Sequence, residues 1–292
     1  MARLADRHPA NVDGRWYVDT RCIDCDVARH HAPDLIAALP DGKSVVARQP
    51  ATPAEELQMW RAAVACPTKS IGTTDRAPAP ADVFPWELTP GVFLLGHNDR
   101  RSFGAHAWWV PRSDGGLMVD APHWSADLVT ALEARAGVAD VLLTHRDDIA
   151  DAAKYADHFG ARVWIHEDDR DAVPFATHTI TGVEPTELRP GVLVFPVPGH
   201  TRGSVLYLVD REHLFSGDSL AWSWRRDDLV AWEDVAWYSW SAQLRSLRRF
   251  ADAGLPFSWV LPGHGKWHGA PPAEMHDRLV RLLDRLAGSR AS

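Results

Sequence analysis

Between residues 86 and 292, short apolar runs alternate with amphipathic segments, and this alternation limits the folds that the chain can adopt. The apolar runs are bounded by Gly, Pro or Asp, as strands are, and the amphipathic segments carry apolar residues at helical spacing. Strand-like runs lie at 91–96, 104–111, 115–122, 138–144, 161–166, 191–200, 203–210, 213–219 and 257–265, and helix-like segments at 125–137, 150–160, 241–254 and 273–288. This order predicts an α/β fold in which two sheets pack together with helices outside.

Four polar residues stand where predicted strands end. They are His145, His200, Asp218 and His264, and three of them follow a glycine. Glycine lets the backbone turn sharply, so that the next side chain projects from the edge of the sheet. Taken singly, such a His is most often a loop residue and such an Asp a turn former or helix cap. Together, three imidazoles and a carboxylate form a ligand set suited to zinc or iron.

The motifs that contain three of these residues resemble those of a known family. The runs PGHTRGS, FSGDS and LPGHG, in this order, look like those of metallo-β-lactamase-fold hydrolases, and the resemblance covers about residues 86–270. It implies an αββα sandwich with a metal site in the cleft between the sheets. It also implies that His200 and His264 are ligands and that Asp218 is a carboxylate able to bridge two metals.

The stretch LLTHRDDIAD, residues 142–151, departs from the family pattern H-x-H-x-D-H. His145 matches the first His, Asp147 stands where the second belongs, and the last His is missing under either alignment. The lost nitrogen ligand favours one tightly held zinc or iron ion, although a second ion can still bind, and the added carboxylates favour Fe(II) or Mn(II). The predicted ligands are His145, His200 and His264, a carboxylate of Asp147 or Asp148, and Asp218 as a fifth.

The chemistry expected of such a site is hydrolysis by a water molecule that the metal activates. Asp151 or Asp148 is expected to orient this water, so these two are the candidate catalytic residues. The alternative for Asp147 and Asp148 is a cap on the helix that follows them. Because the family's ligand set is incomplete, two other functions stay open, an iron-dependent redox enzyme and a non-catalytic binding protein that keeps the fold.

Closely spaced thiols mark the N-terminal part of the chain. The candidate ligands there are Cys22, Cys25 and Cys66, with His30 and His31 nearby. Over about residues 12–74 the pattern resembles a single-cluster bacterial ferredoxin, but Ala28 stands at the third Cys position of the loop. Three interpretations stay open: an iron–sulfur cluster held by the three thiolates with or without a His, a structural zinc ion held by thiols and a His, or a domain that kept the fold and lost its metal.

A run of alternating Pro and Ala separates this region from the rest. It predicts a ferredoxin-like domain at 1–75, an extended linker at 76–85 and a metallo-β-lactamase-fold domain at 86–292. If the small domain holds a cluster, the protein is expected to have an electron-transfer partner.

A tryptophan-rich stretch, residues 220–241, directly follows Asp218. From it, Trp222, Trp224 and Arg225 are the candidate substrate-binding residues, because indole rings stack on apolar groups and a guanidinium binds anions. The alternative is that these tryptophans pack against the rest of the protein.

Composition excludes several classes of function. The net charge of -8 argues against nucleic acid or an anionic membrane as a partner, and no apolar run approaches the length of a membrane span. An odd number of cysteines, three, and the lack of an apolar signal segment make the cytoplasm the expected location. We therefore expect a metal-dependent hydrolase acting on a small-molecule substrate.

Overall fold

The computed structural model describes residues 2–288, and the chain divides into two compact units. Unit 1 is Met1–Ala139 with Ala150–Phe159, and unit 2 is Asp140–Ile149 with Gly160–Ser292. The domain boundaries predicted at residues 75 and 86 both fall inside unit 1, and they stay a prediction. Among residues 2–288, none of the helices combines the length and hydropathy that a membrane span needs.

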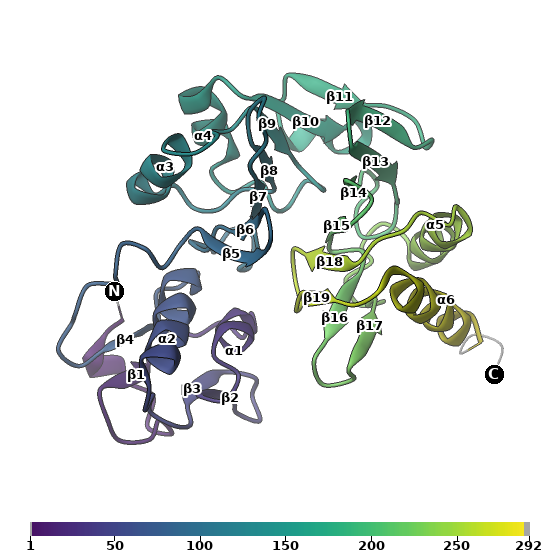
Figure 1. The fold of residues 1–292 in the computed structure, drawn as a ribbon. Coiled ribbons are helices and arrows are strands. Elements are labelled where there is room, and N and C mark those ends of the chain that lie inside the picture. Colours follow the sequence, from purple (N-terminus) through teal and green to yellow (C-terminus); the bar gives the residue numbers. More distant parts are fainter. Residues whose placement is uncertain (1, 289–292) are drawn as a thin grey trace. The chain divides into compact units, whose positions relative to one another are not determined.

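The N-terminal part of unit 1 is a small α+β module (Figure 1). Its elements are β1 (Trp16–Val18) paired antiparallel with β4 (Ile71–Thr73), β2 (Ile36–Ala38) paired antiparallel with β3 (Ser44–Val46), the helices α1 (Val27–His31) and α2 (Pro53–Ala65), and a 3₁₀ turn at Leu4–Asp6. The Thr52 side chain caps α2 by accepting the Glu55 N–H at 3.2 Å. The Trp16 and Trp60 rings meet edge to face at 4.6 Å, so the module has an aromatic core of its own.

The remaining part of unit 1 is an antiparallel meander with two helices. It contains β5 (Trp86–Thr89), β6 (Val92–Leu94), β7 (Trp108–Val110) and β8 (Leu117–Val119), followed by α3 (Ala126–Glu133) and α4 (Ala152–Phe159). The Ser125 side chain caps α3 by accepting the Leu128 N–H. Trp108 and Trp109 are both buried in β7, which accounts for two of the fourteen tryptophans as packing residues.

Unit 2 contains a three-stranded parallel set, a six-stranded sheet, a hairpin and two helices. The parallel strands are β9 (Asp140–Leu142), β10 (Arg162–His166) and β11 (His178–Ile180), with a 3₁₀ helix at Glu167–Ala172. The sheet has the order β12 (Thr186–Arg189), β13 (Val192–Pro196), β14 (Val205–Val209), β15 (His213–Gly217), β18 (Trp259–Pro262) and β19 (His268–Gly269). The hairpin is β16 (Ala221–Ser223) with β17 (Asp228–Val230), and the helices are α5 (Trp240–Asp252) and α6 (Pro272–Gly288).

Helices α5 and α6 lie side by side against the six-stranded sheet of unit 2 (Figure 1). One hydrophobic cluster joins Phe250 of α5 and Leu279 of α6 to Phe195 and Leu206 of the sheet. Each fully buried side chain of this kind contributes about 1.5–3 kcal/mol to folding. The other face of the sheet is also covered, because all five residues of β14 are buried and the Tyr207 hydroxyl donates to the Leu143 carbonyl at 3.0 Å.

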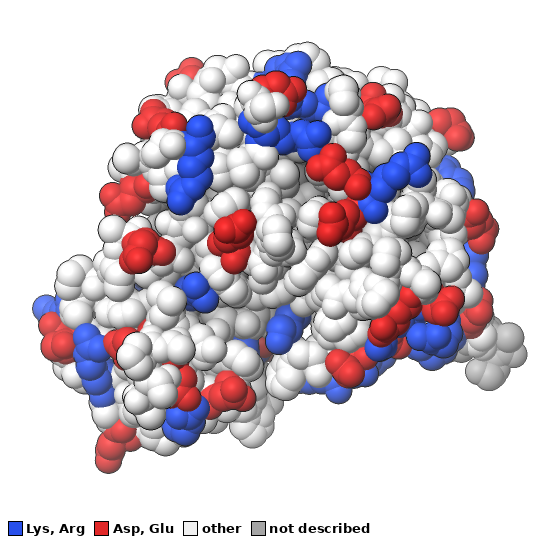
Figure 2. Space-filling view, viewed as in Figure 1, with Lys and Arg blue, Asp and Glu red and all other residues white. Residues whose placement is uncertain are grey.

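The four helices predicted after residue 86 are present as α3 to α6, within a few residues of their predicted ends. The hairpin β16–β17 was not predicted, because its polar tip RRDD interrupts the apolar pattern that marks a strand. On the face drawn in Figure 2, basic and acidic side chains are interspersed, without a broad area of one sign.

Candidate metal centre

The loop after β9 carries the first candidate ligands. Residues 141–143 are buried apolar strand residues, so the chain leaves the sheet edge at Thr144 and His145. The Val205 N–H donates to the Thr144 carbonyl at 2.9 Å, which fixes the start of the loop against β14. The Thr144 hydroxyl lies 2.9 Å from His145 Nδ1 and leaves the Nε2 atom directed into the site.

His200 is held in the loop between β13 and β14. Its Nδ1 atom lies 2.5 Å from the Val235 carbonyl oxygen. Because a carbonyl oxygen only accepts, Nδ1 carries the proton and Nε2 keeps its lone pair, the form in which an imidazole binds a metal. The preceding residue must be glycine, since a Cβ on Gly199 would lie 2.2 Å from the Cβ of Gln243 in α5.

Asp218 and His264 follow β15 and β18, the two parallel neighbours in the sheet. Gly217, just before Asp218, has φ +48°, and a Cβ there would lie 2.6 Å from the Thr144 hydroxyl. The Gly263 N–H donates to the Gly217 carbonyl at 2.9 Å, so the two loops are tied together one residue before each candidate ligand. Both glycines are thus required by close approach.

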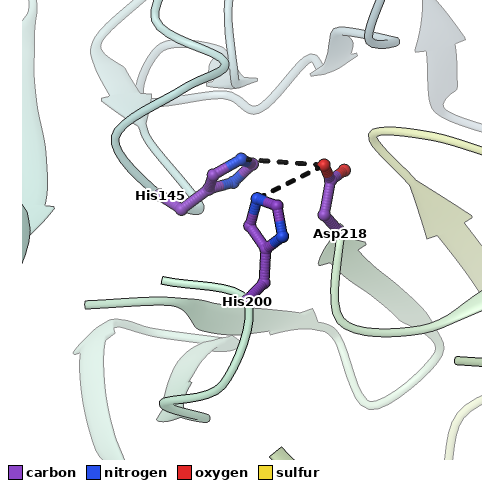
Figure 3. Close-up of side chains that lie close together, drawn as sticks. All are labelled: His145, His200 and Asp218. Carbon is purple, nitrogen blue, oxygen red and sulfur yellow. Dashed lines mark ion pairs between the residues drawn. The ribbon is translucent and has the colours of Figure 1, made fainter. Parts of the chain in front are cut away.

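Three of the predicted ligands converge (Figure 3). Asp218 Oδ2 lies 3.8 Å from His145 Nε2 and 3.5 Å from His200 Nε2. Ligand atoms about 2.0–2.2 Å from one zinc ion lie about 3.3–3.6 Å from one another in tetrahedral geometry, so this spacing fits an ion with little adjustment. Within residues 2–288, neither Nε2 atom has a hydrogen-bond partner, which is the condition in which a buried imidazole is available to a metal.

A second group of ligand atoms shares Asp218. Asp148, Asp218 and His264 offer atoms within 4.8 Å of one another, and His264 Nε2 lies 3.8 Å from Asp218 Oδ2. Asp148 is 1% exposed. It therefore lies among the candidate ligands, which is one of the two roles that the sequence suggested for it; the other is to orient water. The donor sets of both groups, imidazole and carboxylate, fit zinc or iron.

Asp147 lies at the edge of the first group. Its Oδ2 atom is 3.6 Å from His200 Nε2 and 3.9 Å from His145 Nε2, and its side chain is 38% exposed. Burial would raise the pKa of Asp147, but the His200 and His145 imidazoles outweigh this and lower it below the usual range. The carboxylate is therefore ionised and can serve as a further ligand.

The protonation of the buried histidines matches this arrangement in part. Burial lowers the pKa of His145 to about 4, so its ring is neutral at pH 7. For His200, burial also lowers the pKa, but the Asp147 and Asp218 carboxylates and the Val235 carbonyl raise it above its usual value. A cation bound at His200 Nε2 would take the place of the proton that this atom binds at low pH, so metal binding and protonation compete there.

Asp169 holds two of the ligand loops together. It is 1% exposed in the 3₁₀ helix Glu167–Ala172. Its carboxylate accepts the Arg146 N–H at 3.1 Å, next to His145, and the Thr201 hydroxyl at 2.5 Å, next to His200. Sequence reasoning missed this residue, because it is one of several acidic residues in the run 167–171 and nothing in that run distinguishes it.

Asp151 lies in unit 1, where it accepts hydrogen bonds within an ion-pair cluster. Its partners are Arg101 Nη2 at 2.9 Å, Lys154 Nζ at 3.2 Å, His123 Nδ1 at 3.2 Å and the Trp124 N–H at 2.8 Å. Asp99, His123 and Asp151 form another acidic group with metal-like spacing, but Arg101 Nη2 also lies 2.8 Å from Asp99 Oδ2. The guanidinium thus already supplies the positive charge there. A catalytic role for Asp151 stays a prediction.

The predicted substrate residues lie at the β16–β17 hairpin. Trp222 is 3% exposed and stacks on His268 at 3.5 Å within the core of unit 2, whereas Trp224 is 44% exposed. The Arg225 guanidinium lies 5.3 Å from the Trp224 ring. Their role in binding a substrate stays a prediction. The structure instead brings Trp237 next to a candidate ligand, with its ring 4.6 Å from the His200 imidazole.

The thiols of the small module provide a test of the cluster interpretation. Cys22 accepts the Ser44 N–H and Cys66 accepts the Ser70 N–H, both at 3.3 Å, as sulfurs of a metal site do. Burial raises the pKa of Cys25 to about 12, and the neighbouring Cys66 and Cys22 act in the same direction. The fourth position is the buried Ala28. Three thiols without a fourth do not fit a four-iron cluster held by cysteines alone.

The histidines of this module are engaged elsewhere. His30 Nε2 lies 3.3 Å from Asp26 Oδ2, and the His31 ring meets Phe84 edge to face at 5.7 Å. Burial lowers the pKa of His31 to about 3, so it is neutral at pH 7. Among residues 2–288, the three sulfurs and two imidazoles form no group of three or more whose ligand atoms all lie within 4.8 Å of one another, as the two groups around Asp218 do. A cluster, a zinc ion and an electron-transfer partner stay predictions.

Comparison with known proteins finds matches to parts of the chain. Residues 18–73 match the model of the 4Fe-4S single cluster domain of Ferredoxin I. The hydroxyacylglutathione hydrolase of Xanthomonas campestris pv. campestris (strain B100) is 37% identical over 120 residues, 39% of this chain and 46% of the relative. That of Shewanella loihica is 32% identical over 126 residues, 39% of this chain and 47% of the relative. The chain spans about half the length of these relatives.

Solved structures match over a larger share of the chain. The metallo-β-lactamase FIM-1 from Pseudomonas aeruginosa, in its mono-zinc form, has a TM-score of 0.50 at 18% identity and covers 68% of this chain and 94% of its own. A metallo-β-lactamase from Hirschia baltica has a TM-score of 0.50 at 16% identity and covers 68% and 96%. At such identities the similarity shows the fold alone. The predicted fold class is thereby confirmed: the chain has the α/β metallo-β-lactamase fold, preceded by a ferredoxin-like segment.

Proposed function

We propose that this protein is a metal-dependent hydrolase that cleaves an acyl thioester or a related ester. The observation that carries the proposal is the convergence of His145 and His200 on the carboxylate of Asp218, at 3.8 and 3.5 Å, in a buried site. The name of the relatives, hydroxyacylglutathione hydrolase, suggests an acylated thiol as the first substrate class to test.

The reaction is the addition of water to a thioester carbonyl carbon. The bond from that carbon to sulfur breaks, and the products are a carboxylic acid and a thiol, with the proton of water passing to the sulfur. A zinc ion held by these residues would lower the pKa of a water molecule and polarise the carbonyl group of the substrate. The chain itself orients the ligands, through the Val235 carbonyl behind His200 and the Asp169 carboxylate between the two loops.

Two metal positions follow from the two ligand groups, and they differ in their surroundings. His145 and His200 are 1% exposed and each brings an imidazole, whereas the second group has one imidazole, His264, which is 24% exposed at its side chain. We expect the first position to hold zinc more tightly, because it is more deeply buried and has more nitrogen ligands. The second position replaces the missing family histidine with Asp148.

The experiment is metal analysis combined with turnover. The purified chain is treated with a chelator and reloaded with zinc, iron or manganese, and bound metal is measured by mass spectrometry. Hydrolysis of S-acylglutathione thioesters is followed by the thiol released. We expect turnover that the chelator abolishes and one of these metals restores. Turnover that survives complete metal removal, or a chain that binds none of these metals, would contradict the proposal.

A further inference from the structure

Residues 231–239, here called the aromatic segment, connect the β16–β17 hairpin to α5. Among residues 2–288, eight large hydrophobic side chains are exposed, and three of them, Trp232, Trp237 and Tyr238, belong to this one segment. Their exposed fractions are 37%, 66% and 50%. Exposing so much aromatic surface costs folding free energy unless the surface has a partner, so such a concentration marks a binding site.

The segment is tied to the loop that carries His200. The Tyr238 N–H donates to the His200 carbonyl and the Ser239 N–H to the Gly199 carbonyl, each at 3.0 Å. The Val235 carbonyl in turn accepts from His200 Nδ1. These three hydrogen bonds fix the segment directly beside a candidate metal ligand.

The two ends of the segment lie beside two different candidate ligands. The Trp237 ring lies 4.6 Å from the His200 imidazole at an interplanar angle of 40°. A Cβ on Gly265, the residue after His264, would lie 3.0 Å from Cη2 of Trp232. The segment therefore lies near two residues, His200 and His264, whose Nε2 atoms are 3.5 and 3.8 Å from Asp218 Oδ2.

Each ring uses only part of its surface for these contacts. Trp237 packs one side toward His200 and leaves two thirds of its surface open, next to an imidazole that lies 3.5 Å from Asp218. The charged residues of the segment, Glu233 and Asp234, are acidic and exposed and disfavour an anionic group beside them, whereas the Arg202 guanidinium lies 5.9 Å from the Tyr238 ring. An uncharged flat ring gains the stacking surface without depending on either charge.

We propose that Trp237, with Tyr238 and Trp232, is the specificity-determining surface of the site and selects substrates that carry an uncharged aromatic or similarly flat apolar group. This inference rests on the proposed hydrolase function and names the substrate class for it. Trp237 is not a ligand, so its loss changes which acyl group is preferred and leaves metal binding intact.

The test compares two neutral thioesters of N-acetylcysteamine, one with a 3-phenylpropanoyl group and one with an acetyl group. For the zinc-loaded protein we expect kcat/KM to be higher for the phenyl substrate. In Trp237→Ala we expect the ratio of kcat/KM for the phenyl substrate to kcat/KM for the acetyl substrate to fall about tenfold, because the free energy of one aromatic stacking contact corresponds to about this factor. The zinc content should be unchanged. Trp237→Phe should restore most of the preference, and Val183→Ala, which removes another exposed apolar side chain of unit 2, should keep all of it.

If Trp237→Ala lowers kcat/KM equally for both thioesters, the inference is overturned, while the hydrolase proposal is unaffected. If the wild-type chain cleaves neither thioester, binding of the uncharged amide 3-phenylpropanamide, measured by titration calorimetry, tests the surface independently. We then expect affinity that Trp237→Ala weakens about tenfold. An amide that binds both proteins equally, or neither of them, would show that the aromatic segment is not a binding surface.

Discussion

Gly263 and Asp218 approach so closely that a Cβ added to the glycine would lie 2.8 Å from Asp218 Oδ1. The same Cβ would lie 2.6 Å from Asp148 Oδ2. Any side chain at this position therefore pushes apart two carboxylates of the second ligand group.

We expect Gly263→Ala to lose the metal held by Asp148, Asp218 and His264 and to keep the one held by His145 and His200. Zinc bound per chain, measured after dialysis at a fixed free zinc concentration, checks this. Gly288→Ala is the matched control, because nothing lies within 4 Å of its added Cβ. A Gly263→Ala protein that binds as much zinc as the wild type would show that the second group holds no metal.

The buried carboxylate of Asp169 joins the backbone after His145 to the side chain after His200. In Asp169→Asn the amide nitrogen takes the place of one oxygen and faces a backbone N–H, that of Arg146 at Oδ2 or that of Gly203 at Oδ1, so at least one backbone hydrogen bond is lost. We expect zinc affinity to fall about tenfold, as when a residue that orients metal ligands is changed. The control is Asp168→Asn, a half-exposed neighbour that pairs with Arg202. Unchanged affinity in Asp169→Asn would mean that the two loops hold their positions without it.

Asp151 offers a test of the catalytic role predicted from the sequence. It is 5% exposed and accepts from Arg101, Lys154 and the Trp124 N–H. We expect Asp151→Asn to lower the free energy of unfolding by about 1 kcal/mol, as measured by urea titration, because the Arg101 and Lys154 side chains are 61% and 60% exposed and remain solvated. Asp157→Asn, at an exposed position of α4, the helix that follows Asp151, serves as the control. Turnover reduced far more than stability would instead support the catalytic role.

The ion pair of Asp99 with Arg101 predicts a pH dependence of stability. Mainly through the hydrogen bond from Arg101, the pKa of Asp99 is lowered from 3.8 to about 2. A lowered carboxyl pKa stabilises the folded state above the unfolded pKa, and this stabilisation is lost as the pH falls from about 4 to 2. Because Arg101 is 61% exposed, the contribution is about 1 kcal/mol after screening. The free energies of unfolding of the wild type and of Asp99→Asn should differ by this amount at pH 6 and converge toward pH 2. A difference that stays constant with pH would exclude the ion pair as its cause.

Ala28 decides what the three thiols can hold. It is buried at the position of the missing cysteine. After anaerobic reconstitution with iron and sulfide, we expect Ala28→Cys to bind about four irons per chain with visible absorbance that dithionite bleaches, and the wild type to bind fewer. Cys66→Ala should bind less iron than the wild type if the module holds any cluster. A wild-type chain that already binds four irons would show that another residue completes the set.

The candidate ligands at the strand ends were predictable, because each follows an apolar run and three follow a glycine. Both features are local and can be recognised in the sequence without knowledge of the fold. His145, His200, Asp218 and His264 were found in this way. For Asp148 the sequence left two roles open, a metal ligand in place of Asp147 and a residue that orients water, and only the folded loop brings it to Asp218 and His264. Trp237 lies in the tryptophan-rich stretch 220–241 that the sequence singled out, but its contact with His200 could not be predicted, because it depends on backbone hydrogen bonds between segments 35 or more residues apart.

All the hydrogen bonds that tie the aromatic segment to residues 199 and 200 use main-chain groups of the segment, the N–H groups of Tyr238 and Ser239 and the carbonyl of Val235. Any amino acid with an N–H supplies the same groups. Replacements at Trp232, Trp237 and Tyr238 can therefore accumulate over evolution without loosening His200. A lineage of proteins with the proposed hydrolase function can thus acquire new substrates while the metal ligands stay in place.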